Sequence, residues 1–208
     1  AITGNDNLIR IEQYGPHTVS AGIVPLLSLN GKDYEAHNAR FVGKGQYIVT
    51  AEDDHSLKLW DGFTGQFIRS FRYHSEWVYD ACTSPDGERV VTASDDGSAT
   101  VFYLEGASDP QKLSINYSGI NKAIFSNDGA EIITAGDDGS VRIWNSQTGR
   151  HKYGILAHSG WVLDVAISPK DNVLASAGDD RVIRTWSYNR QNDGSGLHRE
   201  TLAGHKDW

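Results

Sequence analysis

The 208-residue chain contains no methionine, one cysteine and only five prolines. A single cysteine, Cys82, excludes an internal disulfide and suits a reducing compartment, so the cytoplasm is the expected location. No apolar run is long enough to cross a membrane, which removes the membrane as an expected partner. Because position 1 is not methionine and the chain opens within a repeat, we expect a segment of a larger protein, in which no targeting signal can be assigned.

Basic residues are also scarce relative to acidic ones. Lysine and arginine together number 19 against 27 aspartates and glutamates, which gives a formal charge of −8. A negative surface repels the phosphate backbone of nucleic acids and attracts basic segments. We therefore expect no nucleic-acid partner, and a protein or peptide partner of basic character is favoured.

The feature that the chain has in abundance is an eleven-residue phrase that recurs every 42 residues. Each copy begins with a small hydroxyl residue and alanine, continues through an aspartate pair and ends on an aromatic residue. The four clear copies run from Thr50 to Trp60, Thr92 to Phe102, Thr134 to Trp144 and Ser176 to Trp186, after a fainter copy from Ile2 to Glu12. A period near 42 residues with four short strand patterns in each unit is typical of a β-propeller.

One unit shows how the strands are recognised. Apolar and alternating stretches are separated by turns rich in glycine, proline and aspartate, such as Ser84 to Gly87 and Asp95 to Gly97. The strands expected in this unit are Trp77 to Thr83, Arg89 to Ala93, Ser98 to Tyr103 and Gln111 to Asn116. The fourth is the most polar, as an outermost strand with a solvated edge should be.

The sequence therefore predicts an all-β fold, a β-propeller built of four-stranded antiparallel blades in one domain. The expected blades are residues 1–29 (partial), 30–72, 73–115, 116–156 and 157–202, followed by a stub at 203–208. Five units and a stub are expected to form an incomplete ring of a six- to eight-bladed parent, whose remaining blades would be further partners. Because a blade exposes two apolar faces until neighbours cover them, we expect aggregation if the segment is made alone.

These residues resemble the WD-repeat β-propeller family over essentially the whole chain. The resemblance rests on the Ser/Thr-x-x-x-Asp turn, the closing tryptophan, the Gly204-His205 phrase and the dipeptide Trp60-Asp61. It implies a buried polar set in each blade, which is complete here only as His158, Ser176, Asp180 and Trp186. The other blades depart from it: Phe102 replaces the tryptophan, and Asn116 and Lys32 stand where the histidine is expected.

A His-Ser-Asp combination also invites a hydrolase interpretation. Ser176, however, lies inside an apolar strand between Ala175 and Ala177, without a strained elbow or oxyanion donors, so a structural role is favoured. The Asp-Asp pairs fall in different blades, whereas a calcium loop gathers its oxygens within one short segment. The histidines show no metal-ligand spacing, and we expect no catalytic residue, cofactor or metal.

The resemblance further implies a candidate partner-binding face around the central channel. It would be formed by the residue before each turn aspartate and by residues at the start of each first strand: Asp53, Asp95, Asp137, Asp179, Trp77, Asp80, Trp161 and Asp164. Carboxylates interleaved with tryptophans can hold lysine or arginine side chains by ion pairing and cation–π contact. Alternatively, the aspartates only suit their turns and the tryptophans pack between blades.

The function expected from the sequence is a non-catalytic protein-protein interaction scaffold or sensor module that binds a basic or flexible peptide on its acidic face. The alternative is a regulatory WD-repeat domain of a larger signalling enzyme, such as a nucleotide-binding switch protein or a kinase. In that case the catalytic part would lie outside these 208 residues. No nucleophile and base pair outside the structural set favours an enzyme in this segment itself.

Overall fold

The computed structural model describes residues 35–105, 109–114, 118–188 and 198–203, together with the backbone of three strands nearer the N-terminus. Those three strands, β1 (Ile2–Thr3), β2 (Leu8–Glu12) and β3 (Pro25–Asn30), form an antiparallel sheet in the order β1-β2-β3. They fall within the partial first blade expected from the sequence. Of the expected stub, residues 204–208 lie outside the described residues, as do Lys32 and Asn116.

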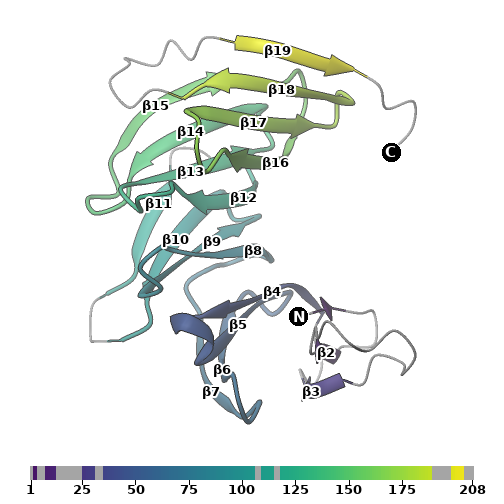
Figure 1. Ribbon diagram of the computed structural model, residues 1–208, viewed down its shortest axis with the longest axis vertical. Coiled ribbons are helices and arrows are strands. Elements are labelled where there is room, and N and C mark those ends of the chain that lie inside the picture. Colours follow the sequence, from purple (N-terminus) through teal and green to yellow (C-terminus); the bar gives the residue numbers. More distant parts are fainter. Residues whose placement is uncertain are drawn as a thin grey trace.

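Four antiparallel sheets of four strands each follow along the chain, and we call them the second to fifth blades (Figure 1). The second contains β4 (Ala36–Val42), the 3-10 turn η1 (Gly43–Gly45), β5 (Tyr47–Glu52), β6 (Leu57–Asp61) and β7 (Phe67–Phe71). The third contains β8 (Val78–Thr83), β9 (Arg89–Ser94), β10 (Ser98–Tyr103) and β11 (Gln111–Ser114). The fourth contains β12 (Ile120–Phe125), β13 (Glu131–Gly136), β14 (Ser140–Asn145) and β15 (His151–Leu156). The fifth contains β16 (Val162–Ile167), β17 (Val173–Gly178), β18 (Val182–Ser187) and β19 (His198–Ala203).

The first strand of each blade lies beside the first strand of the next, β4 against β8, β8 against β12 and β12 against β16. The described blades consequently form an arc that is not closed into a ring (Figure 1). The predicted all-β fold of four-stranded antiparallel blades is confirmed. The strand expected from Trp77 begins one residue later, at Val78, and the polar fourth strand ends at Ser114.

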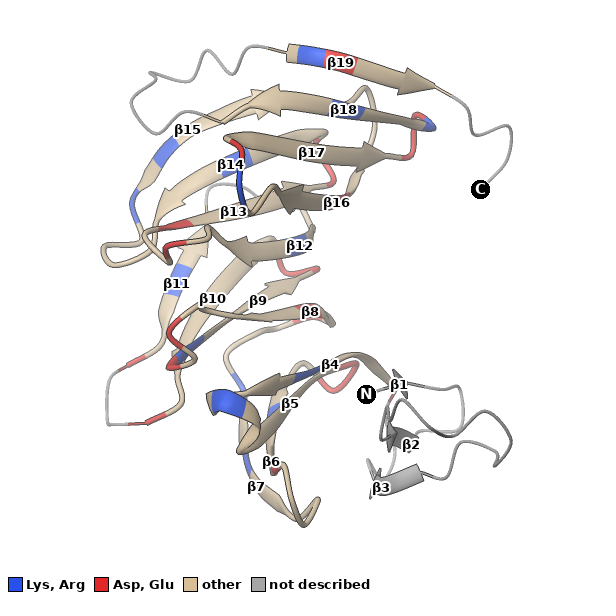
Figure 2. Ribbon diagram, viewed as in Figure 1, with Lys and Arg blue, Asp and Glu red and all other residues tan. Residues whose placement is uncertain are grey.

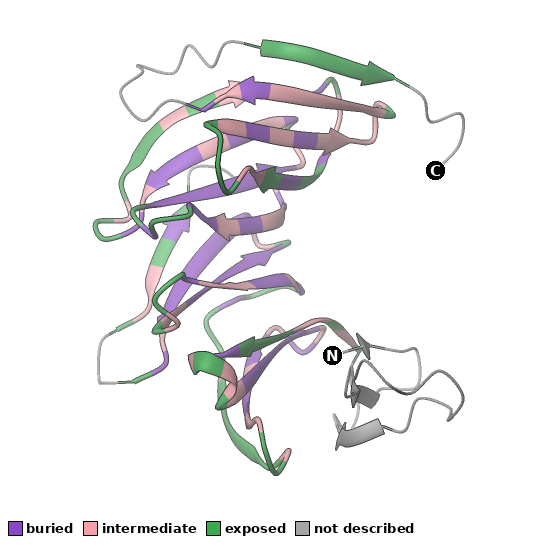
Figure 3. Cartoon of the chain, in the orientation of Figure 1, coloured by how far each residue is buried: buried purple, intermediate pink, exposed green. Residues whose placement is uncertain are grey.

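Apolar side chains of each blade pack against both neighbours, because successive residues of a strand point to opposite faces. In the third blade, Val90 and Phe102 belong to the core shared with the second blade. Val91 and Val101 belong to the core shared with the fourth blade. The middle strands are therefore buried, whereas the outermost strands β7 and β19 are largely exposed (Figure 3).

The fifth blade shows what happens to a face that has no neighbour among the described residues. Ala175, Ala177 and Ile183 are only half-buried there. Their counterparts in the three preceding blades, which the next blade covers, are completely buried: Val49, Ala51, Leu57, Val91, Ala93, Ala99, Ile133, Ala135 and Val141. The same sequence pattern thus yields a dry core only where a second sheet packs on it.

Glycine is required where the turns of neighbouring blades meet. Gly139 has a φ of +78°, and a Cβ on it would lie only 2.3 Å from the carbonyl oxygen of His158. The amides of Ala157 and His158 both donate to the carbonyl oxygen of Gly139, at 2.8 and 3.0 Å. This contact fixes the loop that enters the fifth blade and places His158 for the contacts described below.

Truncating a side chain at a junction between blades should be much more costly than truncating one on an outermost strand. Ile143 is completely buried in the core shared by the fourth and fifth blades, so Ile143→Ala should lower the free energy of unfolding by about 2–5 kcal/mol. The matched change Ile68→Ala on β7, where the side chain is 44% exposed, should cost about 0.5 kcal/mol. Chemical denaturation measures both, and equal losses would contradict the assignment of the core.

Candidate functional site

Every first strand of the four described blades contains a β-bulge at the same place. The register shifts between Ala36 and Asn38 and between Val78 and Asp80, and it shifts at the matching points of the fourth and fifth blades. The bulge residues are His37, Tyr79, Asn121 and Leu163, which are 42 positions apart. A bulge re-aims a side chain at the end of a sheet, so these four side chains are natural candidates for a site.

A backbone hydrogen bond that recurs beside the bulge of all four blades holds the first aspartate of each pair. The amides of Asp53, Asp95, Asp137 and Asp179 donate to the carbonyl oxygens of Glu35, Trp77, Gly119 and Trp161, at 2.9–3.0 Å. Each of these aspartates therefore lies at the same end of its blade, next to the first strand. We call the four side chains the carboxylate row; acidic turns recur from blade to blade on this side of the arc in Figure 2.

The bulge residues differ in what they offer the carboxylate row. His37 Nε2 is in close contact with Asp53 Oδ1, and Asn121 Nδ2 donates to Asp137 Oδ1 at 2.7 Å. Asn121 also donates to the carbonyl oxygen of Val162 at 3.0 Å, which joins the fourth blade to the fifth. Leu163 offers no polar group, and the Asp179 side chain has no hydrogen-bond partner among the described residues. No lysine or arginine of the described residues forms an ion pair with the row.

Two carboxylates of the row approach each other over Gly119. A Cβ on this glycine would lie 2.7 Å from Asp137 Oδ2 and 2.8 Å from Asp95 Oδ1. Burial raises the pKa of Asp137, and the charges of Asp95 and Asp179 raise it further. Burial and the nearby Asp95 and Asp137 likewise raise the pKa of the Tyr79 hydroxyl. The row is thus a concentrated negative charge that is incompletely compensated by the chain itself.

Aromatic rings lie beside the carboxylate row. Trp77 is 49% exposed and Trp161 is 54% exposed, so neither is packed away between blades. The His37 ring lies 6.4 Å from Trp77 and 5.6 Å from Tyr79, measured between ring centroids. Both predicted tryptophans therefore adjoin the row through their backbone, and the Trp77 ring also lies near His37, which contacts Asp53.

The remaining two predicted residues, Asp80 and Asp164, occupy a different position. They follow the bulge and lie along the inner strands, where Asp80 is only 3% exposed. Asp80 Oδ1 accepts from Asn38 Nδ2 at 2.6 Å and lies 3.5 Å from Lys122 Nζ, which is also 3.6 Å from Asp164 Oδ1. Burial raises the pKa of Asp80 against the opposing effect of Lys122 and Arg40. Asp80 thus belongs to a buried contact between blades, separate from the exposed carboxylate row.

The structure brings together the polar set of the fifth blade. His158 Nδ1 lies 2.8 Å from Asp180 Oδ1, and His158 Nε2 lies 2.8 Å from Ser176 Oγ. Trp186 Nε1 donates to the same serine oxygen at 3.0 Å. His158 and Ser176 are 3% and 1% exposed, so the serine is enclosed and no substrate can reach it. The arrangement links the entry loop to the second and third strands of the blade, so its role is structural.

The other blades keep parts of this set. Trp60 and Trp144 donate to the hydroxyls of Thr50 and Thr134 at 3.0 and 2.9 Å. In the third blade, which has Phe102 in place of tryptophan, His74 still lies 3.1 Å from the Asp96 carboxylate and 2.7 Å from the Thr92 hydroxyl.

A basic residue on the third strand contributes to the set, and the sequence analysis did not identify it. Arg184 Nη1 lies 2.6 Å from Asp180 Oδ2, Arg142 Nη1 donates to Asp138 Oδ1 at 3.1 Å, and Lys58 Nζ lies 3.3 Å from Asp54 Oδ2. The three basic residues are spaced by multiples of 42 positions. That spacing, together with the distance of four residues from each aspartate, is the signal that could have revealed them.

The second aspartate of each pair is stabilised in its charged form. The pKa is lowered at all four positions, Asp54, Asp96, Asp138 and Asp180. At Asp180, burial acts to raise the pKa, but hydrogen bonds from Arg184 and His158 outweigh it and lower the pKa to about 2. The two adjacent aspartates therefore have separate roles, the second in holding the blade together and the first at its surface.

The described residues offer little for other kinds of chemistry. No group of three or more histidine, cysteine, aspartate or glutamate side chains is arranged among them to hold a metal ion. Nor does this part of the chain contain a helix with the length and apolar character needed to cross a membrane.

Comparison with known proteins gives matches over most of the chain. The family model described as "WD domain, G-beta repeat" matches residues 25–61, 65–102, 111–145 and 149–187. The nuclear distribution protein PAC1-2 of Uncinocarpus reesii is 28% identical over 96 residues, which is 42% of this chain and 21% of that protein. The nuclear distribution protein nudF 1 of Talaromyces marneffei is 33% identical over 60 residues, 29% of this chain and 13% of that protein. An uncharacterized WD repeat-containing protein of Schizosaccharomyces pombe is 43% identical over 54 residues, 26% of this chain and 9% of that protein. The matched segments span about a fifth or less of these relatives.

Asp180→Asn should separate the two roles of the aspartate pair. Because the folded-state pKa of Asp180 is about 2, below the unfolded value, its carboxylate stabilises the fold above about pH 4, and this contribution is lost as the pH falls toward 2. At neutral pH the variant should lose about 1.5–3 kcal/mol, and its stability should fall less than that of the wild type on acidification. Urea unfolding from pH 7 to pH 2 measures both effects. The matched control, Asp179→Asn, should change neither; a loss equal to that of Asp180→Asn would contradict the assignment.

Proposed function

Because the chain belongs to the WD domain, G-beta repeat family, we propose that it is a non-catalytic protein-interaction module that binds a basic peptide segment on its carboxylate row. Proteins built of these repeats are generally interaction scaffolds. The finer part of the proposal, the basic peptide and its place on the molecule, rests on the charges and exposure of the side chains described above.

The observation that carries the proposal is the pair of carboxylates above Gly119. Asp95 and Asp137 lie close together without a lysine or arginine partner among the described residues, whereas the neighbouring Asp138 is paired with Arg142. The charge of Asp95 helps to raise the pKa of Asp137, which makes ionisation of Asp137 more costly, and an incoming cation relieves that cost. A lysine or arginine side chain of a partner supplies such a cation.

Exposed aromatic rings add to the attraction for a cation. Trp77 lies beside Asp95 through the backbone contact of 3.0 Å, and Trp161 is joined to Asp179 in the same way. A cation over a tryptophan face gains about 0.5–1 kcal/mol at an exposed site. The combination of ring and carboxylate therefore favours lysine and arginine side chains over small inorganic cations.

The repetition of the row points to an extended partner. One carboxylate per blade, held in the same backbone setting across four blades, presents several contacts to a chain that runs across the ends of the first strands. Each exposed ion pair contributes little by itself, about 0.2–1 kcal/mol, so binding depends on several basic residues acting together. Such binding should weaken as the salt concentration rises.

The test is a binding titration with a fluorescein-labelled peptide of alternating arginine and glycine. Asp95→Asn combined with Asp137→Asn should weaken its binding about tenfold, because it removes the two closest charges of the row. The matched control combines Asp171→Asn with Glu200→Gln, two exposed residues elsewhere, and changes the net charge by the same amount. It should leave the affinity nearly unchanged.

Thermal melts establish that both double variants are folded. An equal loss of affinity in the two double variants would show that the peptide responds only to net charge and would overturn the proposed site. Failure of the wild type to bind the peptide at low salt would overturn the proposed function.

A further inference from the structure

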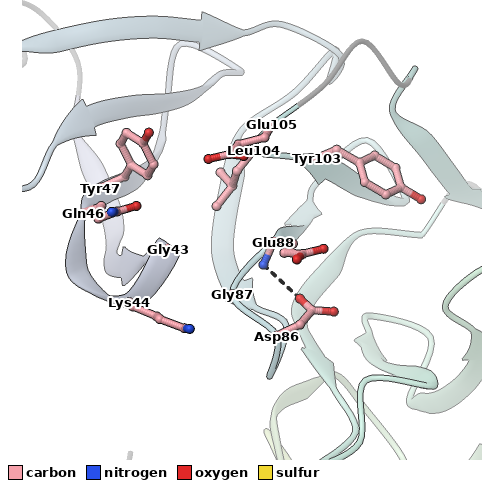
Figure 4. A pocket seen from close by; sticks show the side chains of 10 residues that line it. All are labelled: Gly43, Lys44, Gln46, Tyr47, Asp86, Gly87, Glu88, Tyr103, Leu104 and Glu105. Carbon is pink, nitrogen blue, oxygen red and sulfur yellow. Dashed lines mark hydrogen bonds between the residues drawn. The ribbon is translucent and has the colours of Figure 1, made fainter.

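A cavity of about 480 Å³ lies between the second and third blades. It is lined by the turn η1 and Tyr47 of the second blade and by residues 86–88 and 103–105 of the third. Asp53 follows the end of β5, whereas Tyr47 begins that strand, so the cavity lies at the opposite end of the blade from the carboxylate row. Figure 4 shows Lys44, Gln46 and Tyr47 on one side of it, facing Leu104 and Glu105 on the other.

The next two junctions between blades are closed at the equivalent place. Between the third and fourth blades, Arg89 at the start of β9 donates to Ser146 Oγ and to the carbonyl oxygen of Gly129, both at 3.2 Å. Its guanidinium also lies over the Phe125 ring, 5.1 Å from the centroid. Between the fourth and fifth blades, Glu131 at the start of β13 accepts a hydrogen bond from the Tyr188 hydroxyl.

The junction between the second and third blades lacks a side-chain bridge between these two positions, although Arg69 Nη2 of β7 donates to the carbonyl oxygen of Leu104 at 2.8 Å. Tyr47 occupies the position of Arg89 and Glu131, and Leu104 occupies the position of Ser146 and Tyr188, each at a spacing of 42 residues. Leu104 has no polar group in its side chain, and Tyr47 packs against the apolar cluster that includes Leu104. The cavity thus lies at the junction where these two positions form no polar side-chain bridge.

The turn beside the cavity is also unlike those of the other blades. Gly43, Lys44 and Gly45 all have left-handed backbone, with φ of 56°, 57° and 90°. In the third blade the same connection is the turn from Ser84 to Gly87, in which the amide of Gly87 donates to the carbonyl oxygen of Ser84 at 2.9 Å. Left-handed backbone is uncommon for a residue other than glycine, so the conformation at Lys44 is one that the surrounding fold must impose.

The walls of the cavity combine apolar surface with negative charge. Leu104 is buried at 6% exposure, and Tyr47 and Tyr103 are half-buried. The amide of Leu104 donates to the carbonyl oxygen of Glu88 at 3.0 Å. Glu88 directly precedes β9 and Glu105 follows β10, so the two glutamates lie near each other at the same end of adjacent strands. Both glutamates are exposed, and neither has a hydrogen-bond or ion-pair partner among the described residues.

Two further charged side chains, Asp86 and Lys44, also line the cavity. Asp86 accepts from the amide of Glu88 at 2.9 Å and lies 3.2 Å from Arg89 Nη2. Lys44 is the one basic side chain among the lining residues, against the carboxylates of Asp86, Glu88 and Glu105. The net charge of the lining side chains is consequently negative, and Leu104 and Tyr47 supply apolar surface beside it.

We propose that this cavity binds the side chain of one arginine of a partner protein. The aliphatic part of the arginine packs on Tyr47 and Leu104, and the guanidinium faces Glu88 and Glu105. Arginine fits better than lysine because its planar head can stack on a tyrosine ring and present several donors to two carboxylates at once. This site is separate from the carboxylate row and does not depend on it.

The test is an NMR titration of the chain with Nα-acetyl-arginine-N-methylamide as the probe. Binding should be saturable and should shift the amide signals of Gly43, Gly45 and Gly87, which line or adjoin the cavity. The uncharged analogue of the same shape, Nα-acetyl-citrulline-N-methylamide, should bind more weakly, because it lacks the charge that the glutamates attract. Absence of saturable shifts at these amides, or equal affinity for the two probes, would overturn the proposal.

Glu88→Gln combined with Glu105→Gln should weaken binding of the arginine probe about fivefold, since it removes two exposed ion pairs. Both side chains are exposed, so the variant should remain folded, and a thermal melt establishes this. The matched control of Asp171→Asn with Glu200→Gln should bind the probe like the wild type. Unchanged affinity in the glutamate variant would overturn the proposed site. So would shifts confined to amides of the carboxylate row, which would leave the proposed function standing by itself.

Discussion

Each of the four described blades is apolar on both faces, and the rest of the structure depends on covering both. Val90 and Phe102 pack toward the second blade while Val91 and Val101 pack toward the fourth, so one sheet belongs to two cores. A repeat that satisfies this requirement must present the same faces at the same spacing in every unit, which is what the 42-residue period provides. In the fifth blade, one face has no neighbouring sheet among the described residues, and the apolar side chains on that face are only half-buried.

Stacking the units in register also aligns their turns, and this alignment creates the surface that we propose for binding. An aspartate that would be an ordinary turn residue in one unit recurs in four successive units. Together the four aspartates form a row of negative charge along the same end of the blades. The adjacent aspartate of each pair is engaged inside its own blade by histidine, arginine or lysine. In the same turn the second aspartate pairs with a basic side chain or histidine of its own blade, whereas the first forms no ion pair with a lysine or arginine among the described residues.

Much of the fold could be predicted from the sequence, because alternation and turn residues report directly on strands and hairpins. The set of His158, Ser176, Asp180 and Trp186 was expected from the resemblance to WD-repeat β-propellers, and its side chains do lie in contact. The bulges were not recognisable, since a single extra residue such as Tyr79 or Asn121 leaves no distinct mark on an alternating pattern. Asp80 was expected on the accessible face, but the side chains that enclose it come from other blades, among them Lys122, which is 42 positions away. The cavity between the second and third blades was not predictable for the same reason, because its lining comes from two blades whose packing the sequence of either one does not report.

The most direct test of this division of roles is an NMR titration of the side-chain carboxyl groups of Asp137 and Asp138. These neighbours share one turn and differ in what surrounds them. The pKa of Asp137 should lie above the ordinary value because of burial and the nearby Asp95, Asp138 and Asp179. The pKa of Asp138 should lie below the ordinary value because Arg142 and the amide of Ser140 donate hydrogen bonds to it. Opposite shifts of the two midpoints are the predicted result. Coincident midpoints, or a lower pKa for Asp137 than for Asp138, would contradict the account.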